Sequence, residues 1–306
     1  MNQHLRVLSF AVILASSVIY THSASAHTLG GDESALWLAK VSEIKAEVAN
    51  VAKHVGDKDA IEYYADALGE YWNSNDTREM GERNTLLAQK IPATINATLD
   101  DANAGNQNMV NDDVTKLGGY LDESIPVRID QSKIGNSTVH ALAITFVIKE
   151  TLERYSDALN STVDLNDMSQ MNMSVDKTSG MSMTSMIVDQ NAYENSIALA
   201  TTAQNMFSDL ASKNTDKSNA NTKVSAAFTK LIQDLNNKAD VNTIMTDVHV
   251  NLHPVLVSAY NIQESAESST VYETPTVPEF PLPALLIVIS IAGVVVATRF
   301  RPRLGF

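Results

Sequence analysis

The chain contains no cysteine, which excludes disulfides, thiolate catalysis and zinc or iron–sulfur sites built from cysteine. Basic residues are also scarce, with 22 Lys and Arg against 36 Asp and Glu. This acidic balance argues against nucleic acid or an anionic lipid surface as the partner. Any metal site in this chain must therefore use His, Met or carboxylate ligands.

The sequence also lacks the motifs of familiar enzyme chemistry. It has no G-x-S-x-G, no H-E-x-x-H, no phosphate-binding loop and no dinucleotide fingerprint. The acidic pairs Glu150 with Glu153 and Glu62 with Asp66 have the spacing found on any acidic amphipathic helix, which predicts solvated helix faces. We therefore expect a protein that is not an enzyme.

The N-terminus has the three parts of a secretory signal peptide. Arg6 and the free amine supply a short positive region, residues 7–20 are apolar, and Ala24-Ser25-Ala26 is an A-x-A cleavage site. Residues 1–26 are expected to be removed on export, so that the mature protein begins at His27.

The C-terminus predicts a membrane anchor. Residues 282–298 are uncharged and mostly apolar, and their length is near the lower limit for crossing a hydrocarbon core of about 30 Å. Arg299, Arg301 and Arg303 follow, and the positive-inside rule places them in the cytoplasm and the body outside the cell. Residues 263–281, rich in Ser, Thr, Glu and Pro, are predicted to form a stalk that ends in the sequence Pro278-Glu279-Phe280-Pro281.

This C-terminal arrangement resembles the PEFG-CTERM and PEF-CTERM sorting tails of archaeal surface proteins, especially those of ammonia-oxidising archaea. The resemblance covers residues 277–306, and its sorting motif falls on Pro278, Glu279 and Phe280, with Pro281 where the PEFG form has glycine. It implies an archaeal cell-surface protein and a processing partner similar to an archaeosortase. An ordinary C-terminal transmembrane anchor explains the same residues.

Without the predicted signal peptide and tail, the body is strongly acidic. Removing Arg6, Arg299, Arg301 and Arg303 from the basic residues and Glu279 from the acidic ones leaves 18 against 35, a net charge of −17. That charge suits solubility or the collection of cations.

Apolar residues recur at intervals of three and four through most of the body, which is the period of amphipathic helices and leaves little room for strands. The predicted class is all-α, and Asp76 to Glu79 has the spacing of a capping box. About eight helices follow apolar stripes in residues 38–55, 61–72, 76–95, 110–121, 144–159, 193–207, 224–235 and 241–256.

The eight stripes divide into two sets of four that resemble each other, which predicts a duplicated four-helix unit in a helical bundle. Similar residues are Ala60 to Tyr63 with Ala192 to Asn195, Lys90-Ile91 with Lys230-Leu231, and Val114 with Met245. The predicted organisation is a signal peptide at 1–26, a first repeat at 27–126, a second repeat at 127–262 with an insertion at 164–189, a stalk and sorting motif at 263–281, a transmembrane helix at 282–298 and a basic cytoplasmic tail at 299–306.

The insertion holds the sharpest chemical signal, a cluster of methionines in a polar stretch of Asp, Asn, Ser, Thr and Gln. Core methionines would come with other apolar residues at helical intervals, and these do not. Thioethers are soft ligands that need no deprotonation and select Cu(I). Similar segments occur in extracytoplasmic copper-handling proteins, although a solvent-exposed linker or contact surface is the alternative. The predicted metal ligands are Met168, Met171, Met173, Met181, Met183 and Met186.

Three histidines are further candidate metal ligands. If cleavage follows Ala26, the new amino group and the His27 imidazole could chelate copper as in a histidine brace, although a frayed terminus is the simpler interpretation. His249 and His253 are four residues apart, a spacing that can hold Zn(II) or Cu(II) on one helix face. Pro254 weakens that pair because it would remove a backbone hydrogen bond there, and exposed polar residues are the alternative.

Two other functions remain open from the sequence. One is a non-catalytic envelope protein that contacts other proteins or glycans, and the other is a helical domain associated with iron uptake. Tyr193 to Ala200 resembles a Tyr-x-x-small-x-x-Leu-Ala pattern in the helical regions attached to iron permeases, without an iron-ligand motif. Asn-x-Ser/Thr glycan acceptors support surface exposure, and they occur at Asn75, Asn96, Asn136, Asn160 and Asn172.

Overall fold

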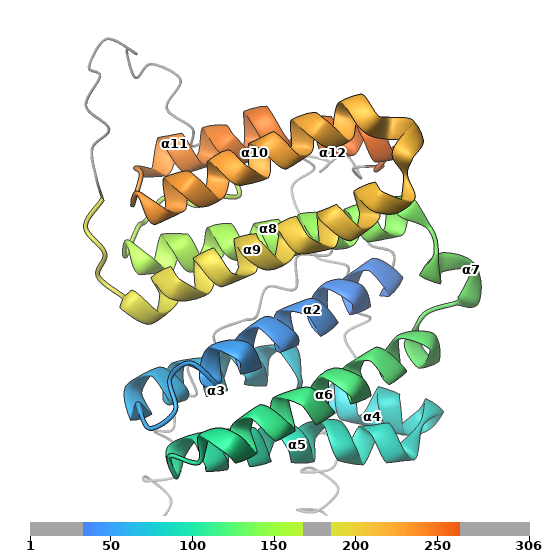
Figure 1. Ribbon diagram of the computed structural model, residues 1–306, viewed down its shortest axis with the longest axis vertical. Helices are drawn as coiled ribbons and strands as arrows, with labels where there is room; N and C mark the ends of the chain where they lie inside the picture. The colour runs from blue at the N-terminus through green and yellow to red at the C-terminus, as the bar shows by residue number, and fades with distance from the viewer. Residues whose placement is uncertain (1–32, 168–184, 264–306) are drawn as a thin grey trace, which may run out of the picture. The chain divides into compact units, whose positions relative to one another are not determined.

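A computed structural model describes residues 33–167 and 185–263 of the chain. These residues form helices joined by turns and short loops, with no strand among them (Figure 1). The all-α class predicted from the apolar period is therefore confirmed for this part of the chain. The predicted signal peptide, sorting motif and membrane helix, and all but the two ends of the insertion, lie outside the described residues.

The helices follow one another in two successive sets. The first set is α2 (Glu33–Val51), α3 (Lys58–Tyr71), α4 (Ser74–Arg83), α5 (Thr85–Asn103) and α6 (Gln107–Arg128). After the short α7 (Gln131–Ile134), the second set is α8 (Ser137–Ala158), α9 (Gln190–Lys213), the 3₁₀ turn η2 (Thr215–Lys217), α10 (Ser218–Asn236), α11 (Val241–Thr246), η3 (Asp247–Leu252) and α12 (His253–Tyr260).

Side-chain caps decide where several of these helices begin. The predicted capping box at Asp76 is displaced by one turn: Asn73 is the cap of α4, and Asp76 is the residue that reaches back to it. The single helix predicted over residues 76–95 is two helices, because the Asn84 side chain accepts hydrogen bonds from Leu86 N and Leu87 N and starts α5 anew.

The two sets share one hydrophobic core in which α2 is the central element. α2 packs against α3, α5 and α6 of its own set and against α8 and α9 of the second set. Figure 1 shows α2 beside α9, with α6 on its other side. The largest fully buried side chains come from both sets, including Tyr64, Phe207 and Phe228. Burying this shared surface is what joins the two sets.

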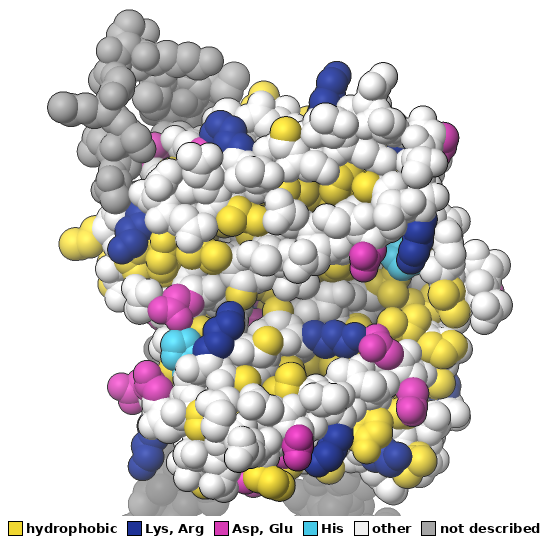
Figure 2. Space-filling model, in the orientation of Figure 1, with side chains coloured by type: hydrophobic (Ala, Val, Ile, Leu, Met, Phe, Trp, Pro, Cys, Tyr) yellow, Lys and Arg dark blue, Asp and Glu magenta, His cyan; other side chains and the backbone are white. Residues whose placement is uncertain are grey.

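The surface in the view of Figure 2 is mixed, with apolar side chains along the bands between helices and charges of both signs scattered among polar groups. Between α2 and α9 lies an open groove of about 370 Å³, lined by small residues such as Ala46, Ala49 and Ala198. Lys53 and Glu194 also line the groove. The groove exists because small side chains on two neighbouring helices do not fill the space between them.

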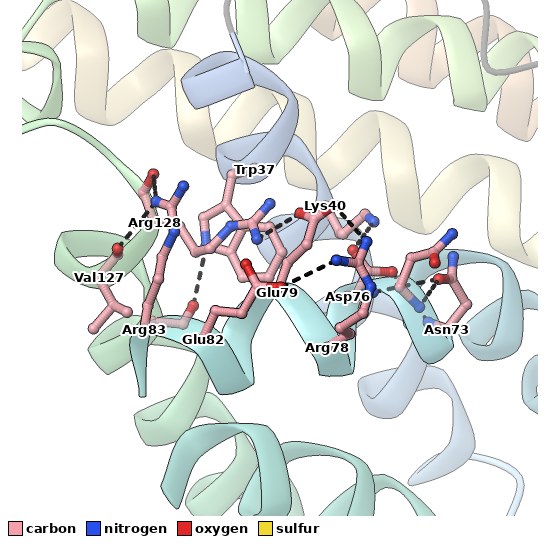
Figure 3. A network of polar contacts seen from close by, with 12 residues as sticks. Trp37, Lys40, Asn73, Asp76, Arg78, Glu79, Glu82, Arg83, Val127 and Arg128 are labelled. Atoms are coloured by element: carbon pink, nitrogen blue, oxygen red, sulfur yellow. Dashed lines mark hydrogen bonds and ion pairs between the residues drawn. The ribbon is translucent and has the colours of Figure 1, made fainter. Parts of the chain in front are cut away.

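Charged contacts fasten α4 to the helices around it (Figure 3). Lys40 Nζ of α2 lies 2.6 Å from Asp76 Oδ1, and Arg128 Nη1 of α6 lies 2.7 Å from Glu79 Oε2. The Arg128 guanidinium also lies 4.6 Å from the ring centre of Trp37. The hydrogen bond that Arg128 donates to Glu79 lowers the pKa of the Glu79 carboxyl. Charged contacts with two neighbouring helices, α2 and α6, therefore help to position this short helix.

The last helical stretch changes winding in its middle. η3 is a π-helix, and the backbone N–H of His253 donates to Val248 O, five residues earlier. Pro254 follows directly and has no backbone N–H to donate. The irregular turn lies where proline was expected to disturb the helix, between His249 and His253.

Candidate functional site

The methionine-rich segment connects the C-terminal end of α8 to the N-terminal end of α9. Met186 is the one predicted methionine ligand within the described ranges, and 80% of its surface is exposed. Met168, Met171, Met173, Met181 and Met183 lie outside the described residues. Exposure of Met186 fits a ligand or contact role better than a core role, because a core methionine would be buried.

The flank before the segment is fastened to α8 and to η3. Ser156 Oγ donates to Val163 O at 3.2 Å, and Asn166 Nδ2 donates to Glu153 Oε1 at 3.3 Å. Leu165 is 1% exposed, so its side chain anchors this flank in the core. Two residues separate this buried anchor from Met168.

The flank after the segment is fastened to the same end of the bundle. Ser185 N donates to Lys238 O at 2.7 Å, in the turn between α10 and α11. Val188 N and Asp189 N both donate to Ala158 O, at 2.8 and 3.2 Å. Since the first flank is also bonded to the final turns of α8, both attachment points of the segment are held by one small region.

His249 takes part in this attachment. Its Nε2 lies 2.7 Å from Leu165 O, and since a carbonyl only accepts, Nε2 must carry the proton. A neutral imidazole of this tautomer keeps a lone pair on Nδ1, the arrangement in which a metal-bound histidine is often oriented by a backbone carbonyl. His253 is half-buried in α12. The histidine pair stays a prediction as a metal site, while the role of His249 in holding the flank is new.

The remaining predicted residues are His27, the sorting motif and the glycan acceptors. His27, Pro278, Glu279, Phe280 and Asn172 lie outside the described residues, so nothing here bears on them. The four remaining glycan acceptors are all on exposed positions: Asn75, Asn96, Asn136 and Asn160.

A second polar cluster, which the sequence did not reveal, is buried where α2 meets α3, α8 and α9. Glu43 and Glu47 on α2 are 7% and 0% exposed. Burial, followed by repulsion from Glu150 and Glu47, raises the pKa of Glu43 well above its ordinary value. Burial also raises the pKa of Glu47 to about 7, against the lowering effect of a hydrogen bond from Asn195.

Arg154 of α8 is the main positive charge in this cluster. Its Nη2 lies 2.6 Å from Glu70 Oε2 and 2.7 Å from Glu150 Oε1, and 12% of its side chain is exposed. The prediction that Glu150 and Glu153 form a solvated face is therefore wrong in part. The Glu150 side chain is only 18% exposed, and burial raises the pKa of Glu153 to about 7. The three-residue spacing of the pair is ordinary for a helix, and the burial of Glu150 comes from tertiary packing.

Three tyrosines of α3 complete the cluster. The hydroxyls of Tyr63, Tyr64 and Tyr71 are buried without a well-formed hydrogen bond to any described residue, and so is Glu47 Oε2. Burial raises the pKa of Tyr63 to about 12. Unsatisfied buried polar atoms are costly and rare, so several in one place mark an unusual site. The sequence period places these tyrosines on an apolar stripe and does not indicate that their hydroxyls are unsatisfied.

Within residues 33–167 and 185–263, no three His, Asp or Glu side chains come together as ligands of one metal ion. In the same ranges, no helix combines the length and the apolar character that a membrane crossing requires. No protein-family model matches this chain, and no curated protein and no solved structure is significantly similar to it.

Proposed function

We propose that this chain is an exported, membrane-anchored protein that captures or buffers copper as Cu(I) outside the cell and is not an enzyme. The observation that carries the proposal is the attachment of the methionine-rich segment. Both of its flanks are hydrogen-bonded at the end of the α8–α9 pair. The methionine cluster therefore lies, along the chain, between two flanks that are both anchored to the helices.

The chemistry of this arrangement favours a soft monovalent ion. The segment contains M-x-x-M-x-M and M-x-M-x-x-M, so each half offers three thioethers. Thioether sulfur selects Cu(I) over harder ions, and fixed attachment points reduce the entropy lost when the segment closes around the ion. Cysteine is absent from the chain, so methionine is its sole source of sulfur ligands.

We further infer that the two helical sets arose by duplication. Asp57 and Asp189 cap α3 and α9 in the same way, each accepting from the backbone N–H three residues later, at Ala60 and Ala192. α5 and α10 have equal lengths of 19 residues. Aligning their first residues brings buried positions together, as the pairs Ile91 with Val224, Ile95 with Phe228 and Ala102 with Leu235.

The last helical stretches of the two sets begin with α6, after its cap Asn106, and with α11, after its cap Asp240, and we align them from these caps. Asp113 then falls opposite Asp247, and both are buried and paired with a lysine. Beyond the π-helical turn the match requires a shift of one residue, after which Leu117 falls opposite Leu252. The helix bounds therefore favour an alignment of the two sets that differs from the sequence-based one, which paired Lys90 with Lys230 and Val114 with Met245. A one-residue insertion accounts for η3.

The copper proposal is tested by a competitive Cu(I) titration of the full-length chain under reducing conditions. We expect one or two ions to bind, because each group of three thioethers can complete one Cu(I) site. In the variant, Met168, Met171, Met173, Met181, Met183 and Met186 are all changed to Leu, and binding should be lost.

The matched control changes Met109 to Leu, because Met109 is exposed on α6, in the other helical set. That variant should bind as the unchanged chain does. Equal Cu(I) binding by the six-leucine variant would place copper elsewhere and overturn the proposal. Absence of any binding would favour the envelope alternative, for which the four exposed glycan acceptors are the relevant surface.

A further inference from the structure

The contact between the two helical sets passes through a carboxyl group that has no access to water. Glu47 of α2 is 0% exposed, and its Oε1 accepts a hydrogen bond of 2.9 Å from Asn195 Nδ2 of α9. The neighbouring Asn50 Nδ2 reaches Asn195 Oδ1 at 3.4 Å. Glu47 Oε2 has no hydrogen-bond partner among the described residues, although a protonated carboxyl would have a hydrogen there to donate.

Charged groups face Glu47 from each helix of this contact. α2 itself contributes Glu43, one turn earlier, with Lys40 beside Glu43. α8 contributes Arg154 and Glu150, and α3 contributes Glu70.

Tyrosine hydroxyls and further charged groups complete the surroundings, among them His54 after α2, whose Nε2 lies 2.9 Å from Glu194 Oε2 on α9. The unsatisfied hydroxyls of Tyr63, Tyr64 and Tyr71 belong to α3, and α9 places Glu194 near Tyr64. From α6, Asp122 pairs with Lys45 on α2. Acidic groups outnumber basic ones around Glu47, so an ionised Glu47 would be both desolvated and repelled.

We propose that the contact of α2 with α8 and α9 is a proton-controlled junction, which is closed while Glu47 carries a proton and loosens when Glu47 ionises. Glu47 interacts electrostatically with Tyr63, Tyr64 and Tyr71, whose buried hydroxyls have no well-formed hydrogen bond among the described residues. This role is independent of copper and needs no ligand besides the proton.

The direction of the pH effect follows from the raised pKa. Glu47 has a pKa of about 7 when buried, above the ordinary value that it regains when the junction opens and water reaches it. The closed junction thus binds the proton more tightly than the open one. Closure is favoured most below the ordinary glutamate pKa, declines by up to tenfold per pH unit above it, and reaches its minimum once pH exceeds about 7.

The absence of cysteine allows a direct test, because two introduced cysteines are the only thiols in the chain. Thr115→Cys on α6 and Asn205→Cys on α9 are exposed positions in the two sets, suitable for spin labels. Distances between the labels are measured in the full-length chain at pH 5 and pH 8. We expect a narrow distribution at pH 5 and a broader, longer one at pH 8, with an open-to-closed ratio higher by on the order of 100-fold.

Glu47→Gln in the same labelled chain should keep the narrow distribution at both pH values, because glutamine still accepts from Asn195 and never ionises. Glu62→Gln, exposed on α3, should behave as the unchanged chain. Glu153→Gln tests instead the glutamate of α8 whose pKa is likewise raised to about 7. The proposal is overturned if Glu47→Gln retains the full pH response, if Glu153→Gln alone removes it, or if the unchanged chain shows no response. Circular dichroism confirms that each variant is folded.

Discussion

Buried tyrosines are satisfied in the second helical set and unsatisfied in the first. In the second set each hydroxyl has a partner: Tyr155 donates to Ala239 O at 2.6 Å, Tyr193 to Leu235 O at 3.0 Å, and Tyr260 to Asn221 Oδ1 at 2.8 Å. In the first set Tyr63, Tyr64 and Tyr71 have no well-formed hydrogen bond within the described part of the chain.

The difference shows that equal burial does not mean equal energetic consequence. In the second set two of the three hydroxyls meet backbone carbonyls at or near helix ends, where free acceptors occur naturally. In the first set the hydroxyls lie among carboxyl groups that include Glu47, and Tyr63 and Tyr71 also interact with Arg154. The buried tyrosines of the second set are therefore satisfied, whereas those of the first set belong to a polar contact whose energy depends on protonation.

The largest expected effect comes from removing the positive charge of that contact. Arg154→Met leaves the largely buried Glu150 and the more exposed Glu70 without their partner. We expect the free energy of unfolding to fall by about 3–5 kcal/mol, because breaking a buried ion pair strands a charge. Denaturant unfolding of the variant and the unchanged chain at pH 7 measures this change in free energy.

The control for this variant is Arg78→Met, which removes an exposed arginine paired with Glu82 at 3.1 Å. It should change the free energy of unfolding by less than about 0.5 kcal/mol, since solvent screens exposed pairs. If Arg154→Met were as mild as this control, the contact between the sets would not depend on its charges.

A smaller effect separates the two groups of tyrosines directly. Tyr260→Phe removes the donor to Asn221 and should cost about 1–2 kcal/mol of unfolding free energy, because a buried acceptor loses its partner. Tyr64→Phe removes a hydroxyl that has no partner among the described residues and should be neutral or stabilising. Parallel denaturant curves give both values. Equal losses of unfolding free energy in the two variants would contradict the difference between the two sets.

The smallest effect concerns the flank of the methionine-rich segment. His249→Leu removes the hydrogen bond to Leu165 O and should cost about 1 kcal/mol while loosening this flank. Limited proteolysis followed by mass spectrometry should then show faster cleavage within residues 160–190. The measurement is sensitive because local opening controls access of the protease.

His140→Leu is the matched control, since His140 Nε2 contacts Ile134 O at 2.6 Å in an equivalent imidazole–carbonyl bond. It should cost a similar free energy of unfolding without changing cleavage between residues 160 and 190. Unchanged cleavage in His249→Leu would mean that the other flank contacts suffice.

Helix positions were largely predictable, and helix ends were less so. Stripes such as Val224, Phe228, Leu231 and Leu235 predicted buried faces correctly, because a 3.6-residue period needs no tertiary information. The break at Asn84 was missed because asparagine is compatible with both a helix interior and a cap, and its local hydrogen bonds decide between them.

The sequence alone determined the helical class, the absence of sulfur chemistry through cysteine and the clustering of methionines in a polar segment, because each depends on residue type and spacing along one chain. Tertiary structure alone decided that Glu43 and Glu47 are buried, that Asn195 meets Glu47, and that His249 holds Leu165. These contacts join residues far apart in the chain, and the environment of a side chain is fixed by whichever helices pack around it, which no local period encodes.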